Sequence, residues 1–453
     1  MINNTNKTNK LDEFIKNPQK ALFTLSLPMM IGMSVQAIYM LIDTAFIGNW
    51  VGGSALAGLG IVFPPMFIIM GITFGLGSGA TTVIAQSIGE KNKSKADNAA
   101  EHIIILGIFL SLVFITIGLL FGDNILKYQG GNQEVVLNAS DYFYTMLCGT
   151  PFMILSIFFR SILSGEGDNM MPMKVLGLGT LINLILDPIF IYHFAIKGAA
   201  LATVISQIIV FLIFIYLMIY KKHNYISLNL NNFKFNLNIL TQTLKIGVPA
   251  SLSMLIMSIG IFFYNTILNQ TDYPVSAIAA YSTAHRIEHL FFIPIISIAT
   301  SMITLMGMFY GAKRYDLIDN VIYFAIKISL SISIIYSIIF YLCSGFLLSL
   351  FTNEPEIINI GIGYFQIFAF AVPFISIAMN CSRAMQGLGK AYPMFIITCL
   401  RVIIISCFLA HYFINYLDKP IEFAWIAILI SCIVSAFISF IWLYKVKNNL
   451  RIS

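Results

Sequence analysis

Charged residues are scarce in this 453-residue chain. Asp, Glu, Lys and Arg together make up 10% of it, whereas hydrophobic residues make up 58%. A soluble globular domain carries about 25% charged residues. So little charge cannot cover a water-facing surface, and the apolar excess needs lipid to contact. The composition therefore predicts an integral membrane protein.

Cysteine is scarce as well. No C-x-x-C pair occurs, and the six cysteines lie inside or beside apolar runs: Cys148, Cys343, Cys381, Cys399, Cys407 and Cys432. This pattern argues against structural zinc and against a disulfide framework, and we interpret these residues as small buried hydrophobes. His and Glu at metal-ligand spacing are also missing, as is a nucleophile–base pair. We therefore expect no enzyme activity, no metal centre and no cofactor.

The first twenty residues contain no apolar core of the kind found in a cleavable signal peptide. We therefore expect the first apolar segment to remain in the membrane as a helix. The formal net charge is +6. We interpret this excess as a signal of membrane topology rather than of nucleic-acid binding.

Twelve apolar segments are long enough to cross a bilayer, which takes about 20 helical residues. The predicted helices start near Ala21, Ser54, Ala96, Asn138, Pro172, Gly198, Leu240, Val275, Leu317, Ile357, Ala391 and Phe423. The longest internal polar break divides these spans six and six. The predicted organisation is an N-terminal lobe (1–220), an inter-lobe cytoplasmic linker (221–238) and a C-terminal lobe (239–453).

The placement of Lys and Arg agrees with twelve spans. Seventeen of these residues fall in segments that would share one side of the membrane, and only Lys127, Lys197 and Lys419 fall in the opposite loops. Basic residues concentrate on the cytoplasmic side of membrane proteins. The asymmetry predicts a multi-pass protein of the cell (inner) membrane with both termini in the cytoplasm.

The two halves of the chain resemble each other. Residues 25–35 (LSLPMMIGMSV) align with 246–256 (IGVPASLSMLI), which places Pro28 over Pro249 at an offset of 221. Residues 87–97 align with 309–319, and 160–173 with 383–394. Because each half has six spans, the repeats enter the membrane in the same orientation. The predicted fold is all-α, with twelve transmembrane helices in two pseudo-symmetric six-helix lobes.

Three of the 20 acidic residues lie well inside apolar runs: Asp43, Asp187 and Glu288. A carboxylate at the centre of a span costs at least ~2.5 kcal/mol of insertion free energy, so we expect each of the three to have a structural or functional role. At 1.5 Å per residue, Asp43 lies about 34 Å along the first helix and Asp187 about 22 Å along the fifth. Both therefore reach the outer half of the N-terminal lobe, and Asn183 shares a helix face with Asp187.

These oxygen ligands suit Na⁺ or a proton shared by two carboxylates. The alternative is a buried hydrogen-bonded network that only locks the helices together. Pro28 lacks an N–H and weakens the first helix, which predicts either a hinge or a simple kink.

A second polar cluster lies in the C-terminal half, where Glu288 has His285, Arg286 and His289 beside it. The cluster could bind substrate or a second proton. It could equally brace the lobe, with Arg286 compensating the charge of Glu288. Arg401 lies within a predicted span, and the sequence offers no role for it.

Several motifs resemble those of the multidrug and toxic compound extrusion (MATE) transporter family over about residues 15–448. They are LSLPMMIGMSVQAIYMLIDTAFIG, the QSIGEKN and FYGAKR turns, RSILSGEGDNMMPM, and NLILDPIFIYHF followed by KGAALATVISQ. The resemblance implies two six-helix lobes and export of organic cations driven by H⁺ or Na⁺. It also implies a DinF-like coupling site at Asp43, Asn183, Asp187 and Thr203, and bending of the first helix at Pro28.

Another branch of the family carries a glutamate on helix 7 and an aspartate on helix 10. This chain has apolar or small residues there, around Met257 and Ser376, so the resemblance favours the N-lobe site. The expected partners are cationic or amphipathic organic compounds and membrane lipid, with no nucleic acid, and the family precedent is a monomer. The competing hypothesis is a flippase for lipid-linked oligosaccharides or lipids, from the same superfamily.

Overall fold

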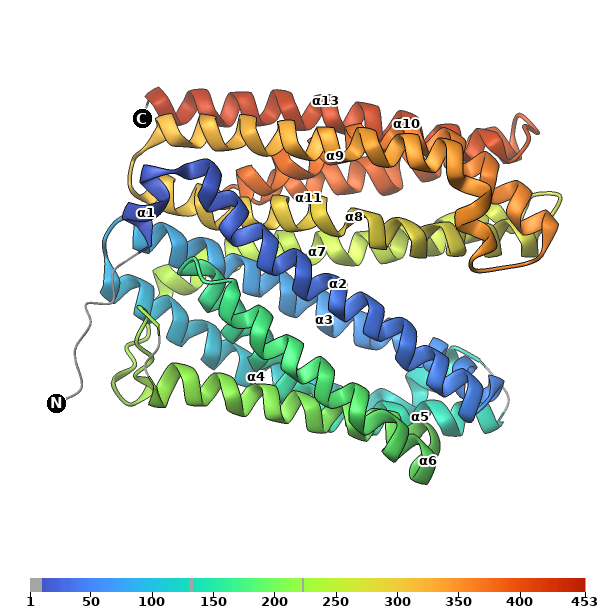
Figure 1. Cartoon of the computed structure of the whole chain (residues 1–453), viewed down its shortest axis with the longest axis horizontal. Coiled ribbons are helices and arrows are strands. Elements are labelled where there is room, and N and C mark those ends of the chain that lie inside the picture. The colour runs from blue at the N-terminus through green and yellow to red at the C-terminus, as the bar shows by residue number, and fades with distance from the viewer. Residues whose placement is uncertain (1–9, 131–132, 222–223, 453) are drawn as a thin grey trace. The chain divides into compact units, whose positions relative to one another are not determined.

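The computed structural model describes residues 10–130, 133–221 and 224–452, and within them eleven helices are long and apolar enough to cross a membrane. Figure 1 shows the helices, which run roughly parallel within each half of the chain. Their bounds are α1 (Leu11–Lys16), α2 (Pro18–Trp50), α3 (Gly53–Gly89), α4 (Lys93–Tyr128), α5 (Gln133–Gly165), α6 (Met170–Ile215), α7 (Leu237–Leu268), α8 (Pro274–Gly311), α9 (Tyr315–Ser349), α10 (Pro355–Gly387), α11 (Tyr392–Cys399), α12 (Phe408–Asn415) and α13 (Glu422–Ile452). The π-helical segments η1 (Tyr216–Tyr220) and η3 (Leu400–Cys407) extend α6 and join α11 to α12, and η2 (Leu230–Asn232) is a short 3₁₀ turn.

One of these helices, α6, contains two of the predicted spans. Its backbone breaks at Ala195, where φ is 51° and ψ is −135°. A Cβ atom on Gly198 would lie 2.0 Å from the carbonyl oxygen of Phe190, so only glycine fits the inside of this bend. Asp418, 223 positions later, has a similar φ of 44° in the loop between α12 and α13. The bend in α6 therefore takes the place of that loop.

With this break counted, the prediction of twelve transmembrane helices is confirmed. The predicted starts lie within five residues of the observed ones, and the largest difference is Asn138 against Gln133. Hydropathy locates these boundaries well because lipid requires an almost continuous apolar segment.

The internal repeat is visible in the turns. Lys91 and Lys313 have φ of 57° and 56°, and Gly167 and Gly389 have φ of 88° and 83°. Each pair is separated by 222 positions, within one residue of the offset between Pro28 and Pro249. A positive φ is uncommon for a residue other than glycine. Its recurrence at two equivalent lysines shows that the halves repeat in structure as well as in sequence.

The chain divides into two compact units. Among the described residues, the first comprises those within 10–12 and 27–247, and the second those within 13–26 and 248–452. In the first unit α5 packs against α3, α4 and α6, and in the second α10 packs against α8, α9 and α13. Helices at equivalent positions of the repeat are therefore in contact in both units.

The chain passes between the units at three points, each of them inside a helix. The first lies between Asp12 and Glu13 in α1, the second between Ser26 and Leu27 in α2, and the third between Gly247 and Val248 in α7. In the two long helices a proline follows at once: Pro28 comes one residue after Leu27, and Pro249 one residue after Val248. The crossings in α2 and α7 thus lie where a proline removes a hydrogen bond from the helix.

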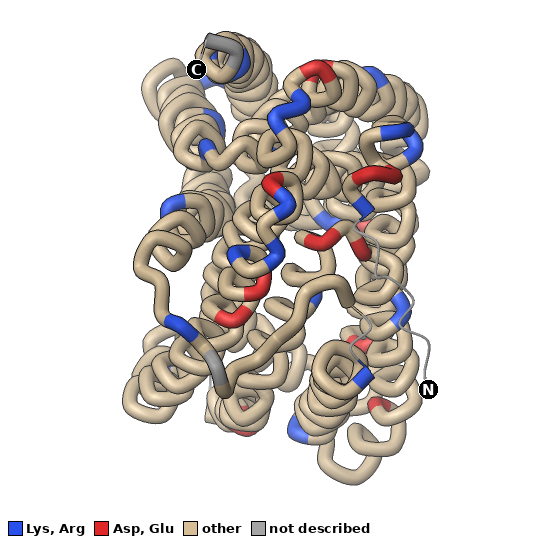
Figure 2. Tube along the Cα trace, turned by 90° about the vertical axis from the view of Figure 1, so that its left-hand side faces the viewer, with Lys and Arg blue, Asp and Glu red and all other residues tan. Residues whose placement is uncertain are grey.

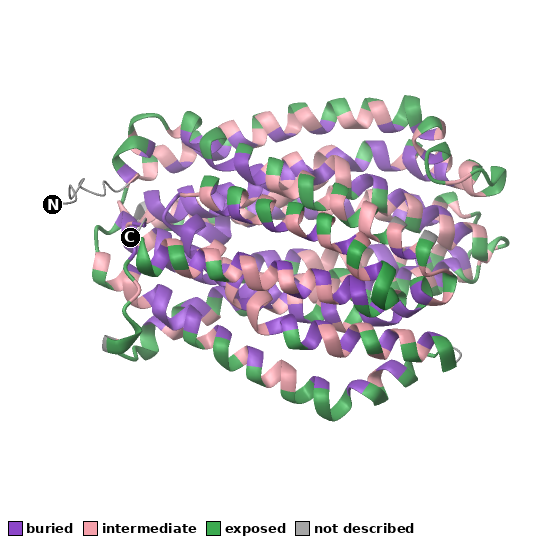
Figure 3. Cartoon of the chain, turned by 60° about the horizontal axis from the view of Figure 1, so that its bottom comes forward, coloured by how far each residue is buried: buried purple, intermediate pink, exposed green. Residues whose placement is uncertain are grey.

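The surface of the helices fits a bilayer. Large apolar side chains such as Phe109, Leu112, Leu119 and Leu120 of α4 are each more than half exposed. Figure 3 shows exposed and half-exposed positions along the outer faces of the helices. Charged residues gather instead on the helix ends and turns seen in Figure 2.

The segment between η1 and α7 is held against the first unit by side chains. Having almost no regular structure of its own, it needs other acceptors for its backbone N–H groups. Carboxylates and one imidazole supply them: Ile226 N–H donates to Glu166 (3.2 Å), Ser227 N–H to Asp97 (2.9 Å), Asn229 N–H to Glu101 (3.0 Å) and Asn236 N–H to His102 Nε2 (3.0 Å). This strap, defined as residues 224–236, therefore belongs structurally to the end of α4 and the α5–α6 turn.

Candidate functional site

The predicted acidic residue of α6, Asp187, lies in a polar niche of the first unit. Its side chain is fully buried. Asn183 Nδ2 donates to Oδ1 and Tyr39 Oη donates to Oδ2, both at 2.9 Å. The i,i+4 spacing places Asn183 on the same face of α6, whereas Tyr39 reaches across from α2. Both carboxylate oxygens are therefore held in fixed positions.

Asp43 lies one helical turn beyond Tyr39 on α2. Its carboxyl group lies within hydrogen-bonding reach of the Asp187 carboxyl group. Among the described residues, its buried Oδ1 has no hydrogen-bond partner. Two ionised carboxylates repel each other, and a hydrogen bond between carboxyl groups needs a proton on one of them. The structure thus brings together the two predicted acids in an arrangement that can hold one proton or one small cation.

Tyr142 of α5 is a further neighbour, because both carboxyl groups act on it electrostatically. It also packs against an apolar cluster of α2, α3 and α6 residues: Ile47, Ala55, Ile191, Ile196 and Ala199. The sequence did not single out Tyr39 or Tyr142. The only available signal was the i,i+4 spacing of Tyr39 and Asp43, which is weak because tyrosine is common in membrane helices.

Two further residues of the first unit, Thr203 and Pro28, were predicted to take part in coupling. Thr203 follows the bend of α6, and its hydroxyl donates to the carbonyl oxygen of Ala199 at 3.0 Å. Pro28 is buried in α2 and precedes Asp43 by fifteen positions, which is about 22 Å of helix.

The C-terminal polar cluster centres on Glu288 of α8, whose side chain is buried. Tyr364 Oη from α10 donates to Glu288 Oε1, and His285 Nδ1 lies 3.2 Å from Oε2. Arg286 and His289, on the same helix, are exposed. The structure thus surrounds Glu288 with a tyrosine and a histidine, and Arg286 makes no ion pair with it within the described chain.

Arg401 lies near this cluster, because it acts electrostatically on both His285 and Tyr281. It belongs to η3, and π-helical segments inside α-helices are frequent at functional sites. Aromatic rings line the neighbourhood: the Tyr281 ring stacks 5.6 Å from His285 and 6.1 Å from Trp425. The sequence could not connect Arg401 to Glu288, since they are 113 positions apart.

Across the described residues there is no group of three His, Cys, Asp or Glu side chains that could hold a metal ion. The six cysteines are free.

A protein-family model described as MatE matches residues 28–189 and 249–417. The chain belongs to the MatE family. The two matched ranges begin at Pro28 and Pro249, the prolines that follow the crossings in α2 and α7. Members of the MatE family are transporters, so this chain is a membrane transporter and not an enzyme.

Two curated relatives and one solved structure illustrate the similarity of this MatE protein to others. The probable multidrug resistance protein YoeA of Bacillus subtilis is 27% identical over 80% of both chains. The multidrug export protein MepA of Staphylococcus aureus is 30% identical over 78% of both chains. A MOP superfamily transporter from Pyrococcus furiosus superposes with a TM-score of 0.94, at 31% identity, over 98% of this chain and 99% of that one.

Proposed function

We propose that this MatE transporter exports small organic compounds, many of them cationic or amphipathic, in exchange for H⁺ or Na⁺ that enters the cell. The relatives named as multidrug resistance and export proteins support the class of substrate. The juxtaposition of Asp43 and Asp187 in a buried niche supports the coupling. That juxtaposition is the single observation on which the proposal depends most.

The chemistry of coupling follows from the charge of the pair. With one proton or Na⁺ bound, the repulsion between the Asp43 and Asp187 carboxylates is relieved, and α2 and α6 can approach. Without it, two negative charges face each other in a site from which water is largely excluded. A cation that binds one helix arrangement better than the other shifts the equilibrium between them, which is what alternating access requires.

The proposed site of bending is Pro28, between Asp43 and the crossing from one unit to the other. A helix bends most easily where proline removes a hydrogen bond. In this proposal the lobes are residues 1–220 and 239–453, joined by the linker 221–238, with both termini in the cytoplasm. Asn183 orients the Asp187 carboxylate, and Thr203 contributes its hydroxyl oxygen when the site holds Na⁺.

We assign Glu288 a second role, as a proton or substrate-cation acceptor in the C-terminal unit. It accepts a hydrogen bond from Tyr364 and lies 3.2 Å from the His285 ring nitrogen, so no permanently charged group neutralises it directly. The stacked Tyr281 and Trp425 rings lie close to this cluster. If the cluster only braces α8 against α10, Glu288→Gln will leave transport intact, because glutamine still accepts the tyrosine hydrogen bond.

The deciding experiment measures efflux of a cationic dye in everted vesicles under separate proton and Na⁺ gradients. Wild type is compared with Asp43→Asn and Asp187→Asn, which preserve size and remove the charge. Asp141→Asn is the matched control, because Asp141 is an exposed carboxylate on α5. We expect one gradient to drive efflux in wild type and the control, and neither gradient to drive it in the two site variants.

Full gradient-driven efflux in both site variants would refute coupling at this pair. If neither gradient drives dye transport in wild type, the flippase hypothesis becomes the better one. It is then tested with a fluorescent lipid-linked sugar in the same vesicles.

A further inference from the structure

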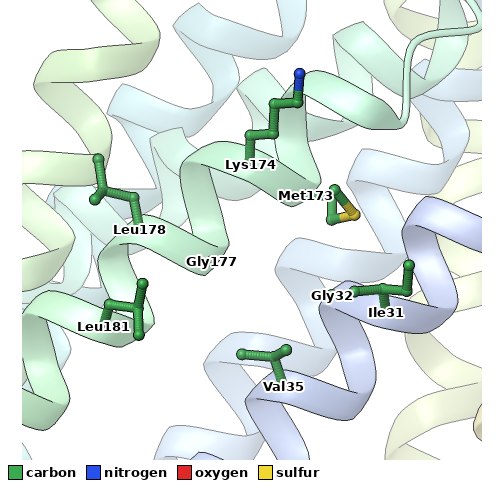
Figure 4. Close-up of a pocket in the computed structure, with 8 residues that line it drawn as sticks. All are labelled: Ile31, Gly32, Val35, Met173, Lys174, Gly177, Leu178 and Leu181. Atoms are coloured by element: carbon green, nitrogen blue, oxygen red, sulfur yellow. The ribbon is translucent and has the colours of Figure 1, made fainter.

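An apolar groove of about 370 Å³ lies between α2 and α6 of the first unit. Figure 4 shows Ile31 and Val35 on its α2 wall, and Leu178 and Leu181 on its α6 wall. Gly177 lies on the α6 wall, and a Cβ atom built on it would meet no other atom within 4 Å. The groove is therefore unobstructed at Gly177.

The walls of the groove are exposed. Ile31 is 45% exposed, Val35 36%, Leu178 46% and Leu181 56%. These side chains lie within segments of sufficient length and hydropathy to span the membrane. In a bilayer such a surface contacts acyl chains.

One end of the groove carries a positive charge, Lys174, the only charged residue among those that line it. Its ammonium group points away from the apolar walls in Figure 4. No carboxylate of the described residues lies within ion-pair distance of it. The acidic residue nearest to Lys174 along the sequence is Asp168. Its carboxylate accepts hydrogen bonds from the N–H groups of Met170 and Met171. It also lies 3.7 Å from Lys10.

The depth of Lys174 matches the lipid headgroups. Because α6 begins at Met170, the lysine lies about 6 Å along the helix at 1.5 Å per residue. The interfacial layer on each side of the hydrocarbon core is roughly 5–7 Å thick. Leu181 lies seven residues further, about 10 Å deeper. The groove thus places a cation at headgroup depth and apolar walls below it.

We infer that this groove binds one anionic phospholipid, with its acyl chain between α2 and α6 and its phosphate at Lys174. Lys174 belongs to the side of the membrane predicted to be cytoplasmic, where anionic lipids are abundant. This lipid site is independent of the coupling site, which lies further along both helices. The bound chain contacts Ile31 and Val35, on the stretch of α2 just beyond Pro28, so that lipid composition affects how readily α2 bends.

The test uses the full-length protein in proteoliposomes of phosphatidylcholine. A small fraction of lipid carries a photoreactive diazirine in its acyl chain, as phosphatidylglycerol in one sample and phosphatidylcholine in the other. Mass spectrometry then maps the labelled peptides. Residues 31–38 and 173–185 report the groove, and residues 105–120 of α4 report lipid that merely surrounds the protein.

We expect the ratio of phosphatidylglycerol to phosphatidylcholine labelling to be about fivefold higher in the groove than on α4, as one lysine contact at the headgroup provides. Lys174→Gln should reduce this ratio to the α4 value. Lys221→Gln, a lysine on the same predicted side but outside the groove, should leave it unchanged.

A second variant fills the groove. Gly177→Leu places a side chain in the open space without a backbone clash, and should reduce labelling by both lipids in the groove. Gly60→Leu is its control, because Gly60 of α3 also has nothing within 4 Å of a built Cβ atom but lies outside the groove. It should leave groove labelling unchanged.

Equal labelling ratios in the groove and on α4 would overturn the inference, as would equal losses with Lys174→Gln and Lys221→Gln. Competition separates the remaining sources of the signal. If soluble glycerol 3-phosphate abolishes the preference, the site binds free phosphate rather than lipid. If a transported dye displaces both probes at a concentration that leaves α4 labelling unchanged, the groove is a substrate site instead.

Discussion

Glu166 offers a sharp test of the electrostatics at the strap. It lies in the turn between α5 and α6, outside the spanning helices, and is 8% exposed. Burial raises the pKa of Glu166 from 4.5 to about 7. This pKa is a balance of causes: burial and the Asp168 carboxylate raise it, whereas the hydrogen bond from the Ile226 N–H and the charge of Lys10 lower it.

The sign of the effect follows from proton binding. Between pH 4.5 and 7 the folded protein holds the Glu166 proton that the unfolded chain has released, so the free energy of unfolding falls as pH rises through this window. Each pKa unit corresponds to about 1.4 kcal/mol, so the loss amounts to about 3 kcal/mol above pH 7. Glu166→Gln removes the titration while its amide oxygen still accepts the Ile226 hydrogen bond.

The assay is SDS-induced unfolding in mixed micelles at pH values between 5 and 8.5. The Glu166→Gln variant should match wild type near pH 5 and become more stable by about 3 kcal/mol at pH 8. Glu90→Gln is the control, because Glu90 is an exposed residue paired with Lys95 and should show no comparable trend. A constant difference between Glu166→Gln and wild type across the whole pH range would refute the reasoning.

Two further substitutions follow from the first unit. Gly198→Ala places a methyl group against the Phe190 carbonyl oxygen at the bend of α6. It should cost several kcal/mol, measured as loss of folded protein on size-exclusion chromatography, whereas Gly177→Ala should fold normally because its Cβ meets open space. Tyr39→Phe removes one donor from Asp187, which costs about 1–3 kcal/mol of carboxylate stabilisation. It should shift the pH at which dye efflux is half-maximal, and an unchanged pH profile would contradict this role for Tyr39.

The helices and the internal repeat could be predicted from the sequence because the bilayer imposes a simple rule on each span. Asp43 and Asp187 stood out for the same reason, since carboxylates inside apolar runs are rare. Their neighbours did not. Tyr39 is an ordinary residue for a membrane helix, and only the packing of α2 against α6 shows that its hydroxyl reaches Asp187.

The hydrogen bonds of the strap could not be predicted from the sequence for a second reason. In the sequence, Asp97, Glu101 and Glu166 belong to the acidic residues outside the apolar runs, where a charged side chain is ordinary. Their partners are backbone N–H groups of residues 226, 227 and 229. Backbone groups carry no sequence signal, so such contacts become visible only in the structure. Arg401 near Glu288 is a similar case, because the two lie on helices far apart in the chain.

The attachment of the strap changes how the two units are joined mechanically. A loose tether would let them swing freely, but residues 224–247 belong to the first unit, and the chain passes between the units inside helices: α1 at Asp12–Glu13, α2 at Ser26–Leu27 and α7 at Gly247–Val248. A helix that bends stores elastic energy and transmits torque, whereas a flexible linker does neither. Lengthening the strap with a glycine–serine insert should therefore leave the turnover rate almost unchanged. Stiffening α2 or α7 beside its proline should lower the turnover rate.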